Sequence, residues 1–233
     1  MDLGRKIGEF TRLDPYERVI EPDPNTPEHC IYKIKLTKPI PDGIADIVGD
    51  LAHNLRSALD NAGYAVAVAS GVADPKFSAF PFAGSVNQMV NALGRAKDVP
   101  HQIQSLFCGF QPYLRGDDLL WALNEICNGD KHKMLTPIGV GTFRTRGFLQ
   151  GTGFVSMPSS HVWNRDKNEM EVFTARTDAK LDYNFDFSLF IAFNDIQIVE
   201  GEPVLRVLET LFHKVERILL GIEAECRRLK IIP

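Results

Sequence analysis

The chain has 233 residues, of which 44% are hydrophobic and 24% are charged, a balance typical of globular proteins. We expect no membrane span and no signal peptide, because no apolar run reaches roughly 20 residues and the N-terminus lacks an apolar core. The net charge of −4 argues against broad nucleic-acid binding driven by the phosphate backbone, although a small basic cleft is compatible with it. The four widely spaced cysteines form no C-x-x-C pair, which fits a reducing cytoplasm better than a zinc ribbon or the disulfides of a secreted protein.

Residues 12–38 predict an N-terminal β-hairpin. The segments 16–20 and 30–38 have a β-like composition, and a turn with three prolines separates them. Residues 44–134 are predicted to be helical. They contain a long helix at about 44–70 that Gly71 ends, a helix at 85–96 capped by Ser85, a short helix at 99–108, and a helix from the Asp117 cap to about Cys127.

Residues 138–199 have a hydrophobic period of two, which predicts antiparallel strands. The clearest strand holds five alternating apolar residues that are expected to face one core: Phe185, Phe187, Leu189, Ile191 and Phe193. Residues 142–149 and 169–176 predict further strands, and the N-terminal hairpin is expected to add to the edge of this sheet. A last helix is predicted at 203–229, with Pro203 in its first turn.

Helices and strands are segregated along the chain, which predicts an α+β fold in a single domain of residues 1–233. The two long helices, at 44–70 and 203–229, are expected to pack together as bundle partners. The predicted architecture is therefore a helical bundle with an antiparallel sheet before the last helix and a hairpin at the N-terminus.

Polar side chains on the first long helix define the candidate site. With Leu55 at the centre of the apolar face, His53, Arg56 and Asp60 share an arc of roughly 60° on the opposite flank. A solvated helix face is usually built from Lys and Glu, so this composition is unusual, and residues 124–133 are polar in the same way. The candidate catalytic residues are His53, Arg56, Asp60, Asp130 and His132, and the candidate binding residues are Asn54, Asn128, Lys131 and Lys133.

These residue types suit RNA cleavage in which the ribose 2′-hydroxyl group attacks the adjacent phosphate. Arg provides a fixed cation with a fork of donors that suits phosphate, His transfers protons near neutral pH, and a carboxylate orients the His or acts as a base. The alternative is a buried polar network that ties two helices together, for example through an Arg56–Asp130 or an Asp60–His132 contact. A metal site of His53, Asp60, Asp130 and His132 is a weaker alternative, because the spacing matches no zinc motif; we therefore expect neither a metal nor a cofactor.

The order of several motifs resembles that of a widespread group of uncharacterised bacterial and phage-associated proteins. The motifs are Asp14-Pro15-Tyr16-Glu17, the HNLRSALD segment at 53–60, Phe80-Pro81-Phe82, Gln111-Pro112-Tyr113, and the segment 123–133 that ends in DKHK. The resemblance covers most of the chain. The group has Arg where this chain has Lys133, and its first helix commonly has His where this chain has Asn61.

The helical part also resembles, more distantly, the HEPN superfamily of four-helix domains. That resemblance implies a homodimeric, metal-independent ribonuclease of a toxin or phage-defence system with RNA or a nucleotide as its partner, although some members are non-catalytic. The superfamily's Arg–His signature is absent after Arg56, and its spacing at Arg206 and His213 falls on an otherwise plain amphipathic helix.

Two hypotheses follow from the residues and the resemblance. In the first, the chain processes RNA or binds a nucleotide through the candidate residues. In the second, it is a non-enzymatic scaffold in which the same residues hold the helices together. Exposure of His53, Arg56 and His132 in an open cleft favours the first hypothesis, whereas a sealed network of mutual hydrogen bonds favours the second.

Overall fold

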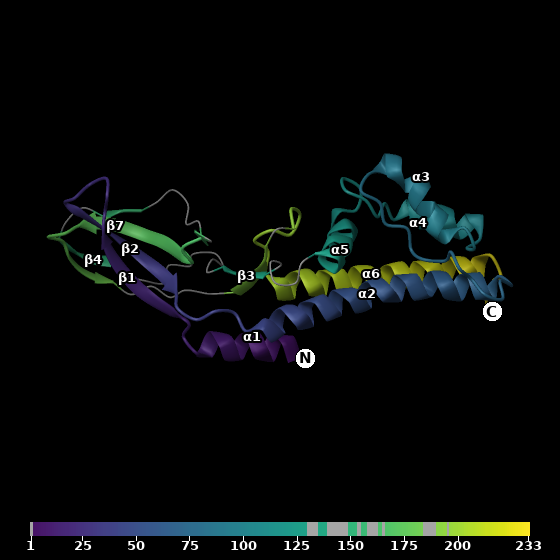
Figure 1. Cartoon of the computed structure of the whole chain (residues 1–233), viewed down its shortest axis with the longest axis horizontal. Helices are drawn as coiled ribbons and strands as arrows, with labels where there is room; N and C mark the ends of the chain where they lie inside the picture. Colours follow the sequence, from purple (N-terminus) through teal and green to yellow (C-terminus); the bar gives the residue numbers. More distant parts are fainter. Residues whose placement is uncertain are drawn as a thin grey trace. The chain divides into compact units, whose positions relative to one another are not determined.

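A computed structural model describes residues 2–129, 135–138, 149–152, 155–157, 163–164, 166–183, 190–194 and 196–233. The chain divides into two compact units, Met1–Ile44 with Leu135–Ala192, and Ala45–Met134 with Phe193–Pro233. The first unit contains most of the strands and the second contains the long helices (Figure 1). The predicted α+β class is therefore confirmed, and folding as a single domain stays a prediction.

A five-stranded sheet forms the first unit. β1 (Tyr16–Pro22) and β2 (His29–Leu36) form the predicted hairpin, and β2 also pairs antiparallel with β7 (Glu169–Arg176). β5 (Val155–Ser156) and β6 (Trp163–Asn164) pair with the other edge of β7. The hairpin thus adds to the sheet, as the sequence predicts.

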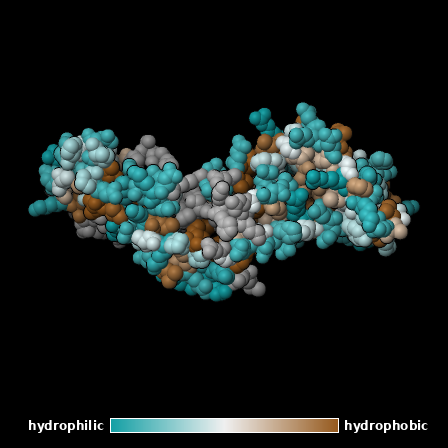
Figure 2. Space-filling model, in the orientation of Figure 1, coloured by the Kyte–Doolittle hydropathy of each residue, from teal (hydrophilic) through white to brown (hydrophobic). Residues whose placement is uncertain are grey.

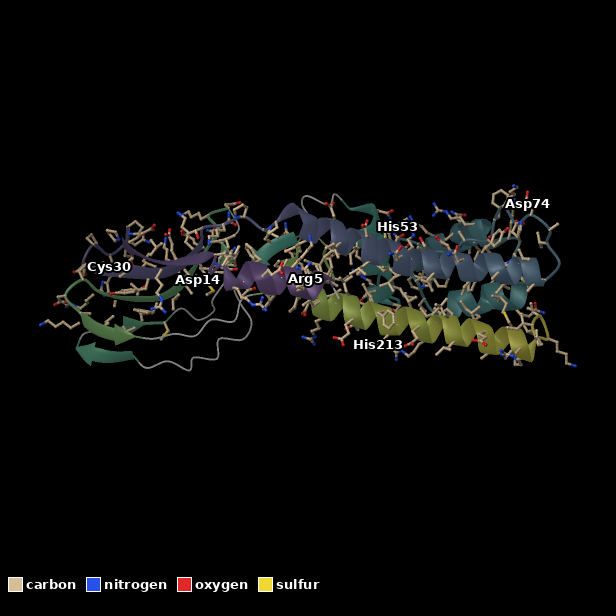
Figure 3. All side chains as sticks on the ribbon, turned by 90° about the horizontal axis from the view of Figure 1, so that it is seen from below. Arg5, Asp14, Cys30, His53, Asp74 and His213 are labelled. Atoms are coloured by element: carbon tan, nitrogen blue, oxygen red, sulfur yellow. The ribbon has the colours of Figure 1, made fainter. Side chains whose placement is uncertain are left out.

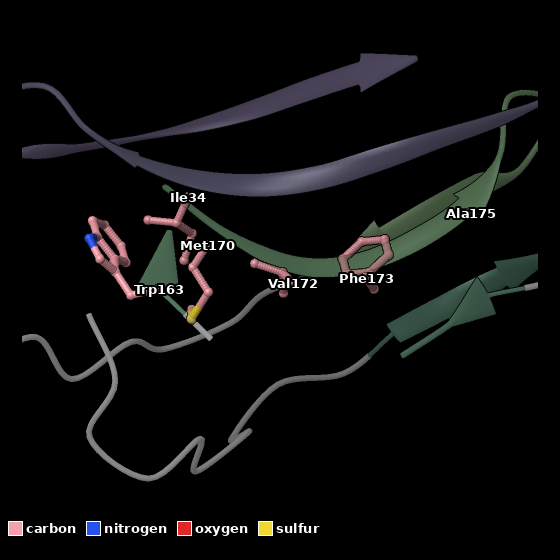
Figure 4. Packing of buried hydrophobic residues seen from close by; sticks show 6 residues of the cluster. All are labelled: Ile34, Trp163, Met170, Val172, Phe173 and Ala175. Carbon is pink, nitrogen blue, oxygen red and sulfur yellow. The ribbon is translucent and has the colours of Figure 1, made fainter. Parts of the chain in front are cut away.

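Apolar residues of β2, β6 and β7 form the core of this unit. Figure 4 shows the buried cluster of Ile34, Trp163, Met170, Val172, Phe173 and Ala175. Tyr32 stacks on Phe173 with the ring centroids 4.2 Å apart, and Tyr16 meets Trp163 edge-on at 6.3 Å. Aromatic contacts of this geometry add to the stabilisation from buried area, so they reinforce the packing of the hairpin against β7 and β6.

A buried ion pair lies in the same sheet. The Nζ atom of Lys33 donates to Oε1 of Glu169 at 2.9 Å and to Oε2 of Glu21 at 2.7 Å. The side chains of Lys33 and Glu169 are only 7% and 8% exposed. Burial by itself lowers the pKa of Lys33, but the hydrogen bonds and charges of the two carboxylates outweigh it, so this pKa is raised and the amine stays protonated.

The structure adds a helix that the sequence analysis did not predict, α1 (Asp2–Arg12). Leu3, Ile7 and Phe10 are buried on one side of it, at the spacing of a helical stripe. The signal was therefore present in the sequence, although the segment is short.

Two smaller strand pairs lie in the described parts of the predicted β region, whereas residues 142–148 of the strand predicted at 142–149 lie outside the described residues. β4 (Leu149–Thr152) pairs antiparallel with β8 (Lys180–Tyr183), and β3 (Leu135–Ile138) pairs with β9 (Phe190–Phe193). The predicted strand at 185–193 is confirmed over β9, where Ile191 and Phe193 are buried as expected. Phe185, Phe187 and Leu189 lie outside the described residues.

Two long helices, α2 (Asp42–Ala69) and α6 (Val204–Arg228), lie side by side in Figures 1 and 3, as predicted for bundle partners. The buried face of α2 is not centred on Leu55 as predicted: Leu51 is 41% exposed, while Ala52 and Ala67 are fully buried. The reason is close approach by another segment. A Cβ atom on Gly63 would overlap the backbone carbonyl oxygen of Ser78, so small residues of α2 face the chain that packs on it.

Short helices complete the second unit. η1 (Val86–Gln88), α3 (Met89–Ala92) and η2 (Leu93–Ala96) replace the single helix predicted at 85–96, and the Ser85 side chain makes no capping hydrogen bond. α4 (His101–Gly109) and α5 (Asp118–Asn128) follow the predictions. Asp117 caps α5 as predicted, because its Oδ1 atom accepts from the backbone N–H of Leu120 at 3.1 Å.

Candidate functional site

Arg56 joins the two polar motifs of the sequence within the second unit. Its Nη1 atom donates to Oδ1 of Asn128 at 3.3 Å, and Asn128 is the last residue of α5. The expected contacts of Arg56 with Asp130 and of Asp60 with His132 involve residues outside the described part of the chain. The motifs thus meet through a different pair, a cation and a neutral amide.

An aromatic ring also holds the Arg56 guanidinium. Its central carbon lies 5.2 Å from the centre of the Phe82 ring, within the range of a cation–π contact. Phe82 is buried, while Arg56 is half-buried. The ring and the Asn128 amide therefore fix the guanidinium from two sides without removing it from solvent.

Asp60 holds the segment that carries this ring. Its Oδ1 atom accepts a hydrogen bond from the backbone N–H of Phe80 at 2.9 Å. The same segment is joined to Gln111-Pro112-Tyr113 by a hydrogen bond of 3.1 Å, which the backbone N–H of Ala83 donates to the carbonyl oxygen of Pro112. The HNLRSALD helix, Phe80-Pro81-Phe82, Gln111-Pro112-Tyr113 and the end of α5 are therefore neighbours around Arg56, although the sequence separates them.

Cys127 lies next to the same guanidinium. Burial raises the pKa of its thiol, and the hydrogen bond and positive charge of Arg56 act in the opposite direction with a smaller effect. The net shift is upward, so the thiol is protonated near neutral pH and is a poor nucleophile. The sequence analysis did not include Cys127 or Phe82 among the site residues, although both belong to motifs that carry the resemblance, Phe82 to Phe80-Pro81-Phe82 and Cys127 to the segment 123–133.

His53 lies exposed on α2 (Figure 3), and the next residue, Asn54, is exposed as well. Because His53 precedes Arg56 by three residues on one helix, the two side chains are neighbours on its surface. The described part of the site is therefore open to solvent rather than sealed. Asp130, Lys131, His132 and Lys133 lie outside the described residues, and their roles stay predictions.

The described residues also bear on two other features, a metal site and a membrane-spanning helix. No group of three or more His, Cys, Asp and Glu side chains is arranged to hold a metal ion among those residues. No helix there is long and apolar enough to cross a membrane. Figure 2 shows mostly hydrophilic residues with scattered hydrophobic ones on the visible face of the second unit.

Comparison of the chain with protein-family models, with curated proteins and with solved structures finds no match. The function must therefore be inferred from the geometry around Arg56.

Proposed function

We propose that the chain is an RNA-processing protein that binds a phosphate group at Arg56. The observation that carries the proposal is a guanidinium fixed by Asn128 and Phe82 but still in contact with solvent. Fixing the group in advance lowers the entropy cost of binding, and the fork of N–H donors suits the oxygens of a phosphate. A half-buried Arg that served only to pair with a carboxylate would not need an aromatic support.

His53 is the proton-transfer residue of the proposed site. It removes the proton of a ribose 2′-hydroxyl group, whose oxygen attacks the adjacent phosphorus while the bond from phosphorus to the 5′-oxygen breaks. Arg56 stabilises the negative charge that develops on the phosphorane oxygens. His132 of the second motif is the proposed acid that protonates the leaving oxygen, which gives a 2′,3′-cyclic phosphate and a 5′-hydroxyl end.

The proposal includes a HEPN-like arrangement of the second unit. Four of its helices have nine or more residues, namely α2, α4, α5 and α6, as a four-helix domain requires. On the same helix face Arg56 has His53 three residues before it and Asp60 four residues after it, so the proposed site uses an order of residues that differs from the superfamily signature.

RNA cleavage by the purified chain in EDTA tests the proposal. The native protein should cleave RNA, and His53→Ala should lower the rate by about 10²- to 10⁴-fold while the fold is retained. His101→Ala is a matched control, because His101 is also exposed and begins α4. Native protein that neither binds nor cleaves RNA, or equal losses in the two variants, would contradict the proposal.

A non-enzymatic scaffold is the second candidate function. The hydrogen bond of Asp60 to the Phe80 backbone favours it, because this carboxylate already serves to hold a loop on α2. Under this hypothesis Asp60→Asn lowers the melting temperature, while the native protein cleaves no RNA. Measuring melting temperature and cleavage on the same protein separates the two candidates.

A further inference from the structure

Beside its buried stripe, α6 has a row of apolar residues at its surface. Leu205 and Phe212 are 45% and 53% exposed, and Leu219 is half-buried. The three residues recur every seventh position. At about 3.6 residues per turn, such a repeat keeps side chains in one narrow strip along the helix.

A row of glutamates alternates with these apolar residues. Glu209, Glu216 and Glu223 also recur every seventh position, and all three are exposed. We call the six residues the α6 seam: Leu205, Glu209, Phe212, Glu216, Leu219 and Glu223. Their alternating spacing of four and three residues places all six on one side of the helix.

The neighbouring helices contact a different flank of α6. Lys214 forms an ion pair with Asp117, the cap of α5, and Gly221 lies against the ring of Phe110 at the end of α4. These contacts of α4 and α5 lie on the flank of α6 opposite the seam, whose residues are exposed or half-buried. Isolated exposed apolar residues are common, but a regular repeat over several turns is typical of a helix-binding surface.

The charges of the α6 seam decide what kind of helix it fits. Glu209 makes no ion pair with any described residue, Glu216 lies 3.6 Å from Nδ1 of His213, and Glu223 pairs with Arg227 of the same helix at 2.8 Å. If two copies of the seam paired in parallel, their glutamate rows would face each other, and in an antiparallel pair each glutamate row would face the apolar row of the other copy; both arrangements are unfavourable. A helix with Lys or Arg beside its apolar stripe would instead pair with these glutamates.

We propose that the α6 seam binds an amphipathic helix of a partner protein that carries a basic flank. Its apolar residues recur every three or four positions and pack on Leu205, Phe212 and Leu219, while its Lys and Arg side chains lie against the glutamate row. The interface does not involve Arg56, so the proposal stands apart from the proposed RNA site.

The test uses the full chain and two labelled synthetic peptides of about five helical turns. Both have Leu at the stripe positions; one has Lys on the flank and the other has Glu. Fluorescence anisotropy should show binding of the Lys peptide and at least about tenfold weaker binding of the Glu peptide. Phe212→Glu should weaken binding of the Lys peptide at least about tenfold, since aromatic residues at the centre of an interface carry much of its affinity.

Two variants make the test specific. Val90→Glu is the matched control, because Val90 is 77% exposed on α3 and lies outside the seam, and it should bind the Lys peptide as the native chain does. The double variant Glu209→Lys with Glu216→Lys should reverse the preference between the peptides. The proposal is overturned by failure of the native chain to bind the Lys peptide, by equal binding of both peptides, or by a native dimer that Phe212→Glu converts to monomer.

Discussion

Replacing Arg56 with Ala distinguishes an accessible binding site from a structural network. The guanidinium donates to Asn128 at 3.3 Å, which as a net hydrogen bond contributes about 1 kcal/mol to stability. Its contact with Phe82 at 5.2 Å contributes a further ~0.5–1 kcal/mol at a partly exposed position. Arg56→Ala should therefore lower the free energy of unfolding by about 1–2 kcal/mol, well below the roughly 3–5 kcal/mol expected when one partner of a buried ion pair is removed.

Urea unfolding and RNA binding, measured on the same protein samples, provide the assay. Arg56→Ala should weaken RNA binding at least about tenfold, and Arg56→Lys should restore little of it because the ammonium group lacks the planar fork. Arg95→Ala, at an exposed Arg on η2, is the control and should change neither quantity. A loss of stability of about 4 kcal/mol or more would refute the reasoning and favour a structural network. Unchanged RNA binding in a stable Arg56→Ala protein would refute the phosphate site itself.

Three further predictions concern the contacts that hold each unit together. Lys33→Met should cost about 3–5 kcal/mol by urea unfolding, because it leaves the Glu169 carboxylate buried beside an apolar group, and the added change Glu169→Gln should recover much of this loss. Gly63→Ala should lower stability by about 1–3 kcal/mol, since its Cβ atom would overlap the Ser78 carbonyl oxygen; an unchanged unfolding midpoint would show that the loop moves freely. The backbone N–H groups that donate to Asp98 hold the pKa of its carboxyl below the usual value, so its stabilising effect is complete above the unfolded-state pKa and is lost as pH falls through the folded-state pKa. The acid limb of a stability-against-pH curve should therefore flatten in Asp98→Asn and keep its slope in the native chain.

Residues near the candidate site illustrate what could be predicted from sequence. The polarity of His53, Arg56 and Asp60 predicted α2 as the candidate site helix, and the second polar motif predicted a candidate segment that begins at the end of α5; the contact of Arg56 with Asn128 brings the two together. The partner of Arg56 could not be predicted, because spacing along two helices does not determine which residue of one faces which residue of the other. The cation–π contact of Arg56 with Phe82 could not be predicted either, because it depends on how a segment without regular structure lies across α2.

The sequence by itself determined the elements whose stabilisation is local and periodic. The stripe of α6 places apolar residues at the interval of a helix, and the three prolines of the hairpin turn separate its two strands. Only the tertiary structure decided which face of α2 is buried, because the closest neighbour of Gly63 is a backbone carbonyl rather than an apolar side chain. It also decided that Asp60 holds the Phe80 backbone and that Arg56 meets Asn128. Such contacts join residues far apart in the chain, and their geometry depends on the packing of all the intervening elements, which no local pattern encodes.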